Sequence, residues 1–331
     1  MEPKIRVNLT YRDYYSLESD MVLFHYVDEE GETTNNRFFN DLICHFYSQL
    51  EKKKNQEISA DIDSLLRNLR PDTANAIRNK VLERLSEEDP TSSMPYDCSY
   101  SFRPLKENEE SFRYIETNLL QGRSLSSYYR HLFHQYLALT SAERERILFL
   151  PVLERVEEAI KAKKALLLPS PLGGTAFYPY VVATTREERM NYVLGMDEER
   201  QCYSYHLFKL KGILSTQDSY RFTEAEKKKL SLFASSSIEY AKDEYVECTV
   251  RLTKRGEKMY RGIFHNRPIP QKKEGDTYTF LSPYDQLFTY FIRFGKEAEV
   301  LSPETMRTDF RRFYHAAHKV YQVAEPGKKK S

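Results

Sequence analysis

The chain has 331 residues and a mass of 39.2 kDa, enough for about two to three domains. It is 40% hydrophobic and 30% charged with a formal net charge of +1, so composition predicts a soluble globular protein and requires any basic surface to be local. No apolar run approaches the ~20 residues of a membrane span, no signal-peptide layout opens the chain, and the four cysteines lack CxxC spacing. These features favour a cytoplasmic location and argue against zinc or a disulfide framework.

The first segment predicts a strand followed by two helices. The sequence KIRVNLTYR (4–12) alternates apolar and polar residues, as a strand with one buried face does. Apolar residues at helical spacing follow, and Gly31 then interrupts the pattern. The sequence RFFNDLICHFYSQLEKKK predicts a second helix, with capping side chains at 33–36 just before it. A lone strand leaves its backbone groups unpaired, so it needs a partner elsewhere.

That partner is expected in a second copy of the same unit. After a predicted helical insert at 57–89, the sequence CSYSFRP alternates as a strand, and two helices separated by Gly122 follow it. Aligning RFFNDLICHFY with SYYRHLFHQYL places Leu42 on Leu132. Two copies some ninety residues apart form an internal repeat, which predicts an antiparallel ribbon made from the two strands.

Strand–helix–turn–helix units joined through their strands resemble the ribbon-helix-helix fold, here as a pseudo-dimer within one chain. The resemblance implies nucleic-acid contacts from outward ribbon residues, namely Arg6, Asn8, Thr10, Ser101 and Arg103. It also implies phosphate contacts at the N-termini of the second helices, from Thr34, Asn35, Ser124 and Ser126. Pro104 departs from the pattern by removing a ladder donor. Two alternatives to nucleic-acid binding stay open: the polar residues form the solvated face of an ordinary antiparallel strand pair, or the ribbon serves only to pair the two copies.

The remainder predicts three further segments and a tail. The duplicated unit spans 1–140, and Ser141 is the expected N-cap of a linking helix at 141–164 that follows it. Segment 165–238 predicts four or five short strands forming a small antiparallel barrel or bent sheet, then a helix capped by Thr223. Segment 239–323 predicts strand, strand, helix, strand, helix, and 324–331 a disordered tail.

The strand-rich segment resembles the WYL domain, a small Sm-like β-barrel of bacterial regulators. Pro179 matches the family's proline, 191–193 its Trp-Tyr-Leu strand, and 208–213 its closing strand, although the chain has no tryptophan and carries Gly212 where the family has arginine. A basic, aromatic face suited to single-stranded RNA is expected from Arg189, Tyr192, Tyr205, His206, Lys209 and Lys211. In the alternative reading, the tyrosines are core residues and the lysines are merely solvated.

The C-terminal segment resembles the extension that follows WYL domains, which in the family commonly mediates dimerisation. Its marks are an apolar helix around 287–291, Phe294-Gly295, and the run Glu299-Val300-Leu301-Ser302-Pro303. The predicted fold class is therefore α+β and multidomain: a duplicated ribbon-helix-helix, a WYL barrel and an α+β extension. This order resembles the WYL accessory proteins of type VI-D CRISPR systems, which implies single-stranded RNA binding, stimulation of an RNA-guided effector nuclease and a homodimer.

Three functions of different classes stay open at this stage. The first is the RNA-binding accessory protein; the second is a transcriptional regulator that binds duplex DNA and senses a ligand; the third is a protein-interaction scaffold. No GxSxG, HExxH, P-loop or paired-carboxylate motif occurs, so we expect no enzyme, no cofactor and no metal site. The weakly basic ribbon and the Tyr/Lys face favour the first function.

Overall fold

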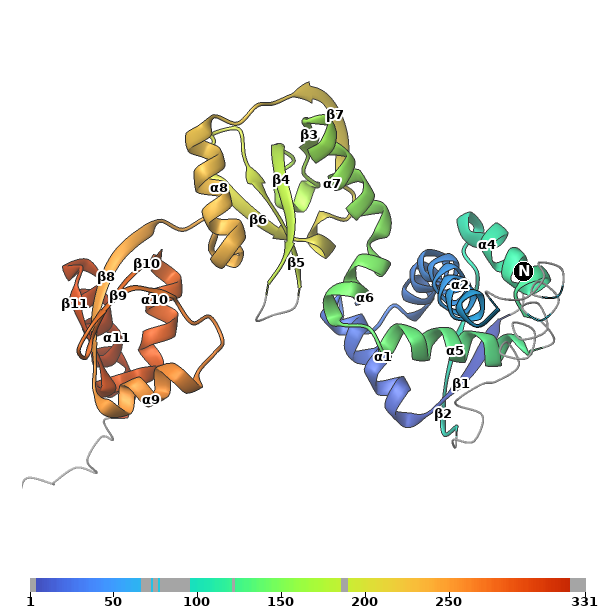
Figure 1. Cartoon of the computed structure of the whole chain (residues 1–331), viewed down its shortest axis with the longest axis horizontal. Helices are drawn as coiled ribbons and strands as arrows, with labels where there is room; N and C mark the ends of the chain where they lie inside the picture. The colour runs from blue at the N-terminus through green and yellow to red at the C-terminus, as the bar shows by residue number, and fades with distance from the viewer. Residues whose placement is uncertain are drawn as a thin grey trace, which may run out of the picture. The chain divides into compact units, whose positions relative to one another are not determined.

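The computed structural model in Figure 1 describes residues 4–66, 73, 77, 96–120, 123–185 and 190–321, without the side chains of 53–66 and 236. Within these ranges, no helix has the length and apolar character needed to cross a membrane. The chain divides into two compact units. Unit 1 comprises Met1–Glu154 and Leu207–Lys211, and unit 2 comprises Arg155–His206 and Gly212–Ser331. Both contain helices and sheets, so the prediction of a multidomain α+β chain is confirmed.

Unit 1 is built on a two-stranded ribbon. Strands β1 (Ile5–Leu9) and β2 (Cys98–Phe102) pair antiparallel, with Ile5 opposite Phe102 and Leu9 opposite Cys98 (Figure 1). The strand pairing predicted from the repeat is therefore confirmed. Side chains alternate between the two faces of a strand, so one face of the ribbon points into unit 1, where Val7 and Tyr100 are buried.

Each copy of the repeat supplies two helices that cover the inner face of the ribbon. The first copy contributes α1 (Tyr11–Leu23) and α2 (Asn35–Leu66), and the second contributes α4 (Glu109–Asn118) and α5 (Leu125–Leu137). Leu42 and Leu132, equivalent in the alignment, are both fully buried. The core between the copies is aromatic, with ring contacts among Phe38, Phe39, Phe102, Tyr129, Phe133 and Tyr136.

Each copy also holds the strand of the other by equivalent side chains. In the second copy, Ser126 Oγ accepts the Asn8 N–H (3.3 Å) and Arg130 Nε donates to the Asn8 carbonyl (3.0 Å). In the first copy, Asn36 Oδ1 accepts the Arg103 N–H at 2.6 Å. Asn40 Nδ2 donates to the Arg103 carbonyl at 2.8 Å. The repeat alignment pairs positions 36 with 126 and 40 with 130, so the clamps are equivalent and exchanged between the copies.

Several element boundaries in unit 1 differ from the predictions. Thr10 is the N-cap of α1, and its hydroxyl accepts the Asp13 N–H. Residues 57–66, expected to begin an insert, continue α2; most of that insert and the predicted tail at 324–331 lie outside the described residues. The predicted linking helix is two helices, α6 (Ser141–Leu148) and α7 (Leu150–Ala162). The capping box uses Thr140 rather than Ser141, because the cap lies just outside the first helical residue.

The first part of unit 2 is a five-stranded antiparallel sheet in the order β6-β5-β4-β3-β7. Its strands are β3 (Lys164–Leu167), β4 (Ala176–Thr184), β5 (Asn191–Met196), β6 (Cys202–His206) and β7 (Leu214–Ser219). Every residue of β5 is buried, as expected for a strand covered on both faces. Helix α8 (Glu224–Ser236) follows, capped by Thr223 as predicted, and the structure adds a capping box with Glu226.

The predicted closing strand at 208–213 is wrong. Leu207–Leu210 form a 3-10 helix, and Gly212 adopts a positive φ of 85°. Such a φ suits glycine, which has no Cβ to clash. Leu207 and Leu210 are buried, so their spacing follows the 3-10 turn of three residues rather than the strand period of two.

The second part of unit 2 is a four-stranded antiparallel sheet in the order β11-β8-β10-β9. The strands are β8 (Tyr245–Leu252), β9 (Pro270–Glu274), β10 (Thr277–Pro283) and β11 (Ala298–Ser302). The helices are α9 (Lys254–Gly262), α10 (Tyr284–Phe291) and α11 (Glu304–Val320). Helix α9 is missing from the predicted order, although Thr253 caps it with a side-chain acceptor.

Candidate nucleic-acid interface

The outer face of the ribbon carries a small set of polar groups. Arg6, Asn8 and Arg103 are exposed and Ser101 is half-buried. Arg6 Nε donates to Ser99 Oγ at 3.2 Å across the ribbon. Thr10 does not belong to this face, because its hydroxyl caps α1. The ribbon therefore presents two guanidinium groups, a weak positive surface.

The two predicted phosphate sites at helix N-termini differ in what remains available. At α5, Ser124 Oγ accepts the Ser127 N–H of its own helix and Ser126 Oγ accepts the Asn8 N–H, so both hydroxyls are engaged. At α2, Thr34 precedes the helix and Asn35 begins it. Asn35 Oδ1 is buried and has no hydrogen-bond partner among the described residues. The α2 terminus thus has the more available polar groups.

A cavity of about 630 Å³ opens at the start of α2. We call it the α2 pocket, and it is lined by His25, Tyr26, Val27, Thr34, Asn35, Asn36, Arg37, Leu105, Glu107 and Lys211. Residues from two different predicted sites line this pocket: Lys211, predicted for the RNA-binding face, and Thr34 and Asn35, predicted for phosphate contact at the helix N-terminus. The segment is held by its aromatic ring, since Phe208 stacks on His25 with ring centroids 4.7 Å apart.

The α2 pocket concentrates positive charge. Lys211 Nζ lies 4.9 Å from the centroid of the Tyr26 ring. Burial, and then the nearby Arg37 guanidinium, lower the pKa of Lys211, with Asp41 opposing. The first N–H groups of α2 lack intrahelical acceptors and carry the positive end of the helix dipole. Glu107 is the single carboxylate in the lining, so the pocket favours an anion.

Arg37 was not predicted, although the sequence contains a signal for it. Arginine at the third residue of α2 opposes the helix dipole, which prefers acidic residues in the first turn. Arg37 forms an ion pair with Asp41 at 3.9 Å, and the Arg37 side chain is 60% exposed. Solvent-exposed ion pairs of this kind add little stability. Helix stability therefore does not explain an arginine at this position.

The residues predicted for the basic, aromatic face do not lie on one strand face. Arg189 lies outside the described residues. Tyr192 is only 6% exposed and its ring lies 4.1 Å from His206, so it packs in the core of the sheet. Tyr205 is half-buried, in contact with Phe177 (centroids 5.3 Å apart). The single face shared with Lys209 and Lys211 is wrong, because 207–211 lacks the strand alternation and belongs to unit 1.

One additional cation does lie on the tyrosine side of β6. Tyr203 and Tyr205 point the same way with rings nearly parallel, 6.1 Å apart and 4° between planes. Lys242 Nζ lies 5.3 Å from the Tyr203 ring centroid, a cation–π geometry. Lys242 takes the position beside these rings that was expected for Lys209.

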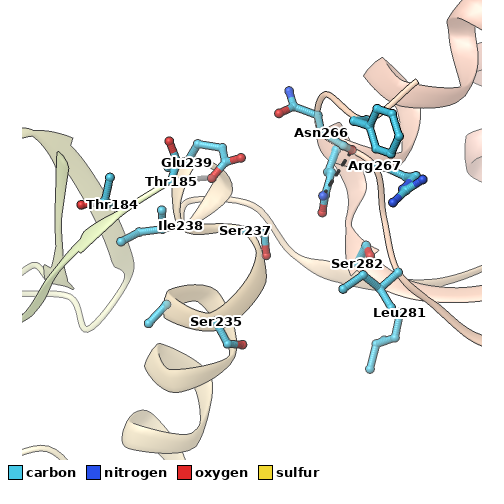
Figure 2. Close-up of a pocket in the computed structure, with 14 residues that line it drawn as sticks. Thr184, Thr185, Ser235, Ser237, Ile238, Glu239, Asn266, Arg267, Leu281 and Ser282 are labelled. Carbon is cyan, nitrogen blue, oxygen red and sulfur yellow. Dashed lines mark hydrogen bonds between the residues drawn. The ribbon is translucent and has the colours of Figure 1, made fainter. Parts of the chain in front are cut away.

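A cavity of about 610 Å³ in unit 2 has a different character. Figure 2 shows Thr184, Thr185, Ile238 and Glu239 on one side and Asn266, Arg267, Leu281 and Ser282 on the other. Its one cation, Arg267, lies over the Phe264 ring at 4.8 Å, and Glu239 balances the charge. This cavity brings together none of the predicted site residues.

The comparisons with known proteins concern the fold. No protein-family model matches the chain, and no curated protein matches it. One solved structure, described as a CRISPR Cas-related protein, superposes with a TM-score of 0.75 at 19% sequence identity. The match covers 98% of this chain and 96% of the other. The whole chain therefore shares its fold with that protein.

A second solved structure matches weakly. Proteasome accessory factor B/C of Arthrobacter aurescens is 13% identical to this chain and superposes with a TM-score of 0.28. The match covers 97% of this chain and 50% of that protein's chain. That score is too low to support an argument.

Proposed function

We propose that this chain is a single-stranded-RNA-binding accessory protein that stimulates an RNA-guided CRISPR ribonuclease and has no catalytic site of its own. The observation that carries the proposal is the α2 pocket, where Lys211, Arg37 and the positive end of α2 surround one cavity. The shared fold with a CRISPR Cas-related protein supports the assignment to such a system. The type VI-D effector as partner is the finer part of the proposal.

In this proposal, the two copies in unit 1 form a ribbon-helix-helix pseudo-dimer, and the five-stranded sheet of unit 2 is the Sm-like barrel of a WYL domain. The exchanged clamps support the first assignment, because each copy completes the other, as the subunits of a dimer do. The C-terminal segment joins two chains. Phe313 within α11, Val320 at its end and Tyr321 just after it are 46%, 79% and 83% exposed, which supports an apolar contact along this helix.

RNA binds in this proposal through phosphate contacts and ring stacking. The α2 pocket holds a phosphate, since a helix N-terminus and two cations complement its charge. Tyr203 and Tyr205 with Lys242 offer a stacking face for bases, which tolerates different sequences. Two modest sites on one chain, doubled by dimerisation, raise the overall affinity by avidity.

The test is fluorescence anisotropy of labelled single-stranded RNA against the full chain at about 50 and 200 mM salt. The Arg37→Ala/Lys211→Ala variant should weaken binding and reduce the slope of log affinity against log salt by about 1.4, because each single-strand phosphate contact contributes about 0.7. The matched control is Lys254→Ala/Lys258→Ala, which removes two exposed cations from α9. Equal losses in both variants would refute the α2 pocket as the RNA site. Cleavage by the effector with and without the chain tests stimulation.

The ribbon favours one second candidate, a regulator that binds duplex DNA. Arg6 and Arg103 project from a two-stranded antiparallel ribbon, an element that enters a DNA groove in some proteins. Duplex DNA that outcompetes RNA, with affinity lost in Arg6→Ala/Arg103→Ala but kept in Arg37→Ala/Lys211→Ala, would select this function instead.

A further inference from the structure

A second basic cavity lies in unit 2 and shares no residue with the α2 pocket. It measures about 280 Å³, and three cations line it together with three aromatic rings and no carboxylate. The cations are Lys163, Arg221 and Lys227, and the rings are Tyr180, Tyr220 and Phe222. We call it the Lys163 pocket. The net charge of the whole chain is +1, so this concentration of cations without carboxylates is local.

The backbone at Lys163 is unusual for a lysine. Its φ is 54°, the left-handed region where side chains other than glycine, asparagine or aspartate are uncommon. The residue follows the last residue of α7, the position that most often carries glycine. Its carbonyl accepts the Tyr220 N–H at 3.1 Å, which joins the end of α7 to the pocket wall. From this strained position the Lys163 side chain lines the pocket.

The other cations are also available to a ligand. Lys163 and Arg221 have no ion-pair partner among the residues that the structure describes. Lys227 pairs with Glu224 at 2.6 Å, but those side chains are 49% and 88% exposed, so the pair is weak and screened. Lys227 also lies in the fourth position of α8, at the positive end of the helix. Helix-end electrostatics therefore do not explain why these cations converge.

The rings form a wall that a planar group can contact. The Tyr220 hydroxyl donates to the Pro179 carbonyl, which fixes this buried ring as the base of the wall. Phe222 packs against Tyr220 and Tyr180 with centroids 5.0 and 5.8 Å away. Tyr180 and Phe222 remain half-buried, so parts of both rings face solvent.

We propose that the Lys163 pocket binds one phosphorylated nucleoside, with the phosphate held by Lys163, Arg221 and Lys227 and the base against Tyr180 and Phe222. Cations without carboxylates select a phosphate, exposed rings select a planar base, and the volume admits a single nucleotide. The nucleotide comes either free in solution or as one member of a single strand. This site lies outside the α2 pocket on which the proposed function rests.

The experiment is isothermal titration calorimetry of the full chain with AMP, and with adenosine and inorganic phosphate as its separate parts. AMP is expected to bind at least tenfold more tightly than either part, because both halves of the site are then used. Lys163→Gly is the decisive variant: it removes the ammonium group and relieves the positive φ, so the melting temperature should stay equal or rise. We expect Lys163→Gly and Arg221→Ala each to weaken AMP binding at least tenfold, with Lys258→Ala, an exposed α9 lysine, unchanged.

A parallel titration with labelled oligouridylate separates the two sources. If AMP does not bind but Lys163→Gly and Arg221→Ala weaken oligouridylate binding and Lys258→Ala does not, the proposal holds with the strand as the source. If neither ligand responds to these variants, the proposal is overturned. If, in that case, Arg37→Ala/Lys211→Ala is the one variant that loses RNA binding, the proposed function through the α2 pocket remains supported while the nucleotide site is refuted.

Discussion

Asn40 offers the most direct test of how the two copies depend on each other. It is fully buried in α2. Its amide donates to the Arg103 carbonyl at 2.8 Å and accepts the Leu105 N–H at 2.8 Å. Its Nδ2 also donates to the Asn36 carbonyl, and its Oδ1 accepts from Asn108. One side chain thus satisfies two backbone groups just beyond β2.

The expected cost of Asn40→Ala follows from those two backbone groups. A buried polar group left without its partner costs about 1–3 kcal/mol, and Asn40→Ala removes the partner of two part-buried groups, the Arg103 carbonyl and the Leu105 N–H. Water that enters the vacated space recovers part of this cost, so we expect a loss of about 2–4 kcal/mol in the free energy of unfolding. Asn40→Asp should cost at least as much at neutral pH, because a carboxylate oxygen then faces the Arg103 carbonyl.

The assay is urea unfolding followed by circular dichroism, since the chain has no tryptophan. The change in midpoint is converted with the measured m value. Asn118→Ala is the matched control: Asn118 is exposed and, among the described residues, its amide donates to the Tyr114 carbonyl of its own helix. The loss should therefore stay within about 0.5 kcal/mol. If Asn40→Ala also stays within that limit, the exchanged clamp does not stabilise unit 1 and the reasoning is refuted.

Three further predictions concern single sites. Gly195→Ala should destabilise unit 2 by about 1–3 kcal/mol, because an added Cβ would clash with the Tyr178 backbone carbonyl oxygen and lie 2.6 Å from the Phe177 ring. Gly262→Ala meets nothing within 4 Å and should not destabilise the unit; equal melting temperatures of the two variants would contradict this. Burial raises the pKa of Asp20 above its usual 3.8, although Arg144 opposes this. The folded state therefore holds the Asp20 proton more tightly, so the free energy of unfolding of wild type, measured relative to Asp20→Asn, should fall as pH rises from below 3.8 through the raised pKa. A free energy that increases over this pH range would contradict the prediction. Lys211→Met should weaken RNA binding without lowering the melting temperature, since burial already disfavours its charge; a lower melting temperature would indicate a structural role.

The local features of the fold could be predicted from the sequence. Strand alternation in 4–12 placed β1, and the matching apolar patterns placed Leu42 and Leu132 in equivalent buried positions. Thr223 was identified as a cap because threonine just before a helical segment is a preferred N-cap, a purely local signal. The repeat also predicted the pairing of β1 with β2, since an unpaired strand requires a partner.

The errors have a common physical cause. The segment 208–213 has the composition of a strand, yet burial of Leu207 and Leu210 draws it into a 3-10 helix packed in unit 1. Tertiary packing overrides local propensity in such short segments. Tyr192 was expected on a binding face and is instead core, because every residue of β5 is buried, unlike in any other strand of the described ranges.

From the sequence alone, most of the strands and helices, the duplication and the basic and polar residues that could hold a phosphate were predictable, whereas α9 and the 3-10 turn at Leu207–Leu210 were not. Which of these residues lie together depended on the tertiary structure. Lys211 reaches the start of α2 across more than 170 positions in the chain, and Lys163 meets Arg221 and Lys227 in one cavity. Local patterns carry no information about such convergence, because it depends on how separate elements pack around a shared core.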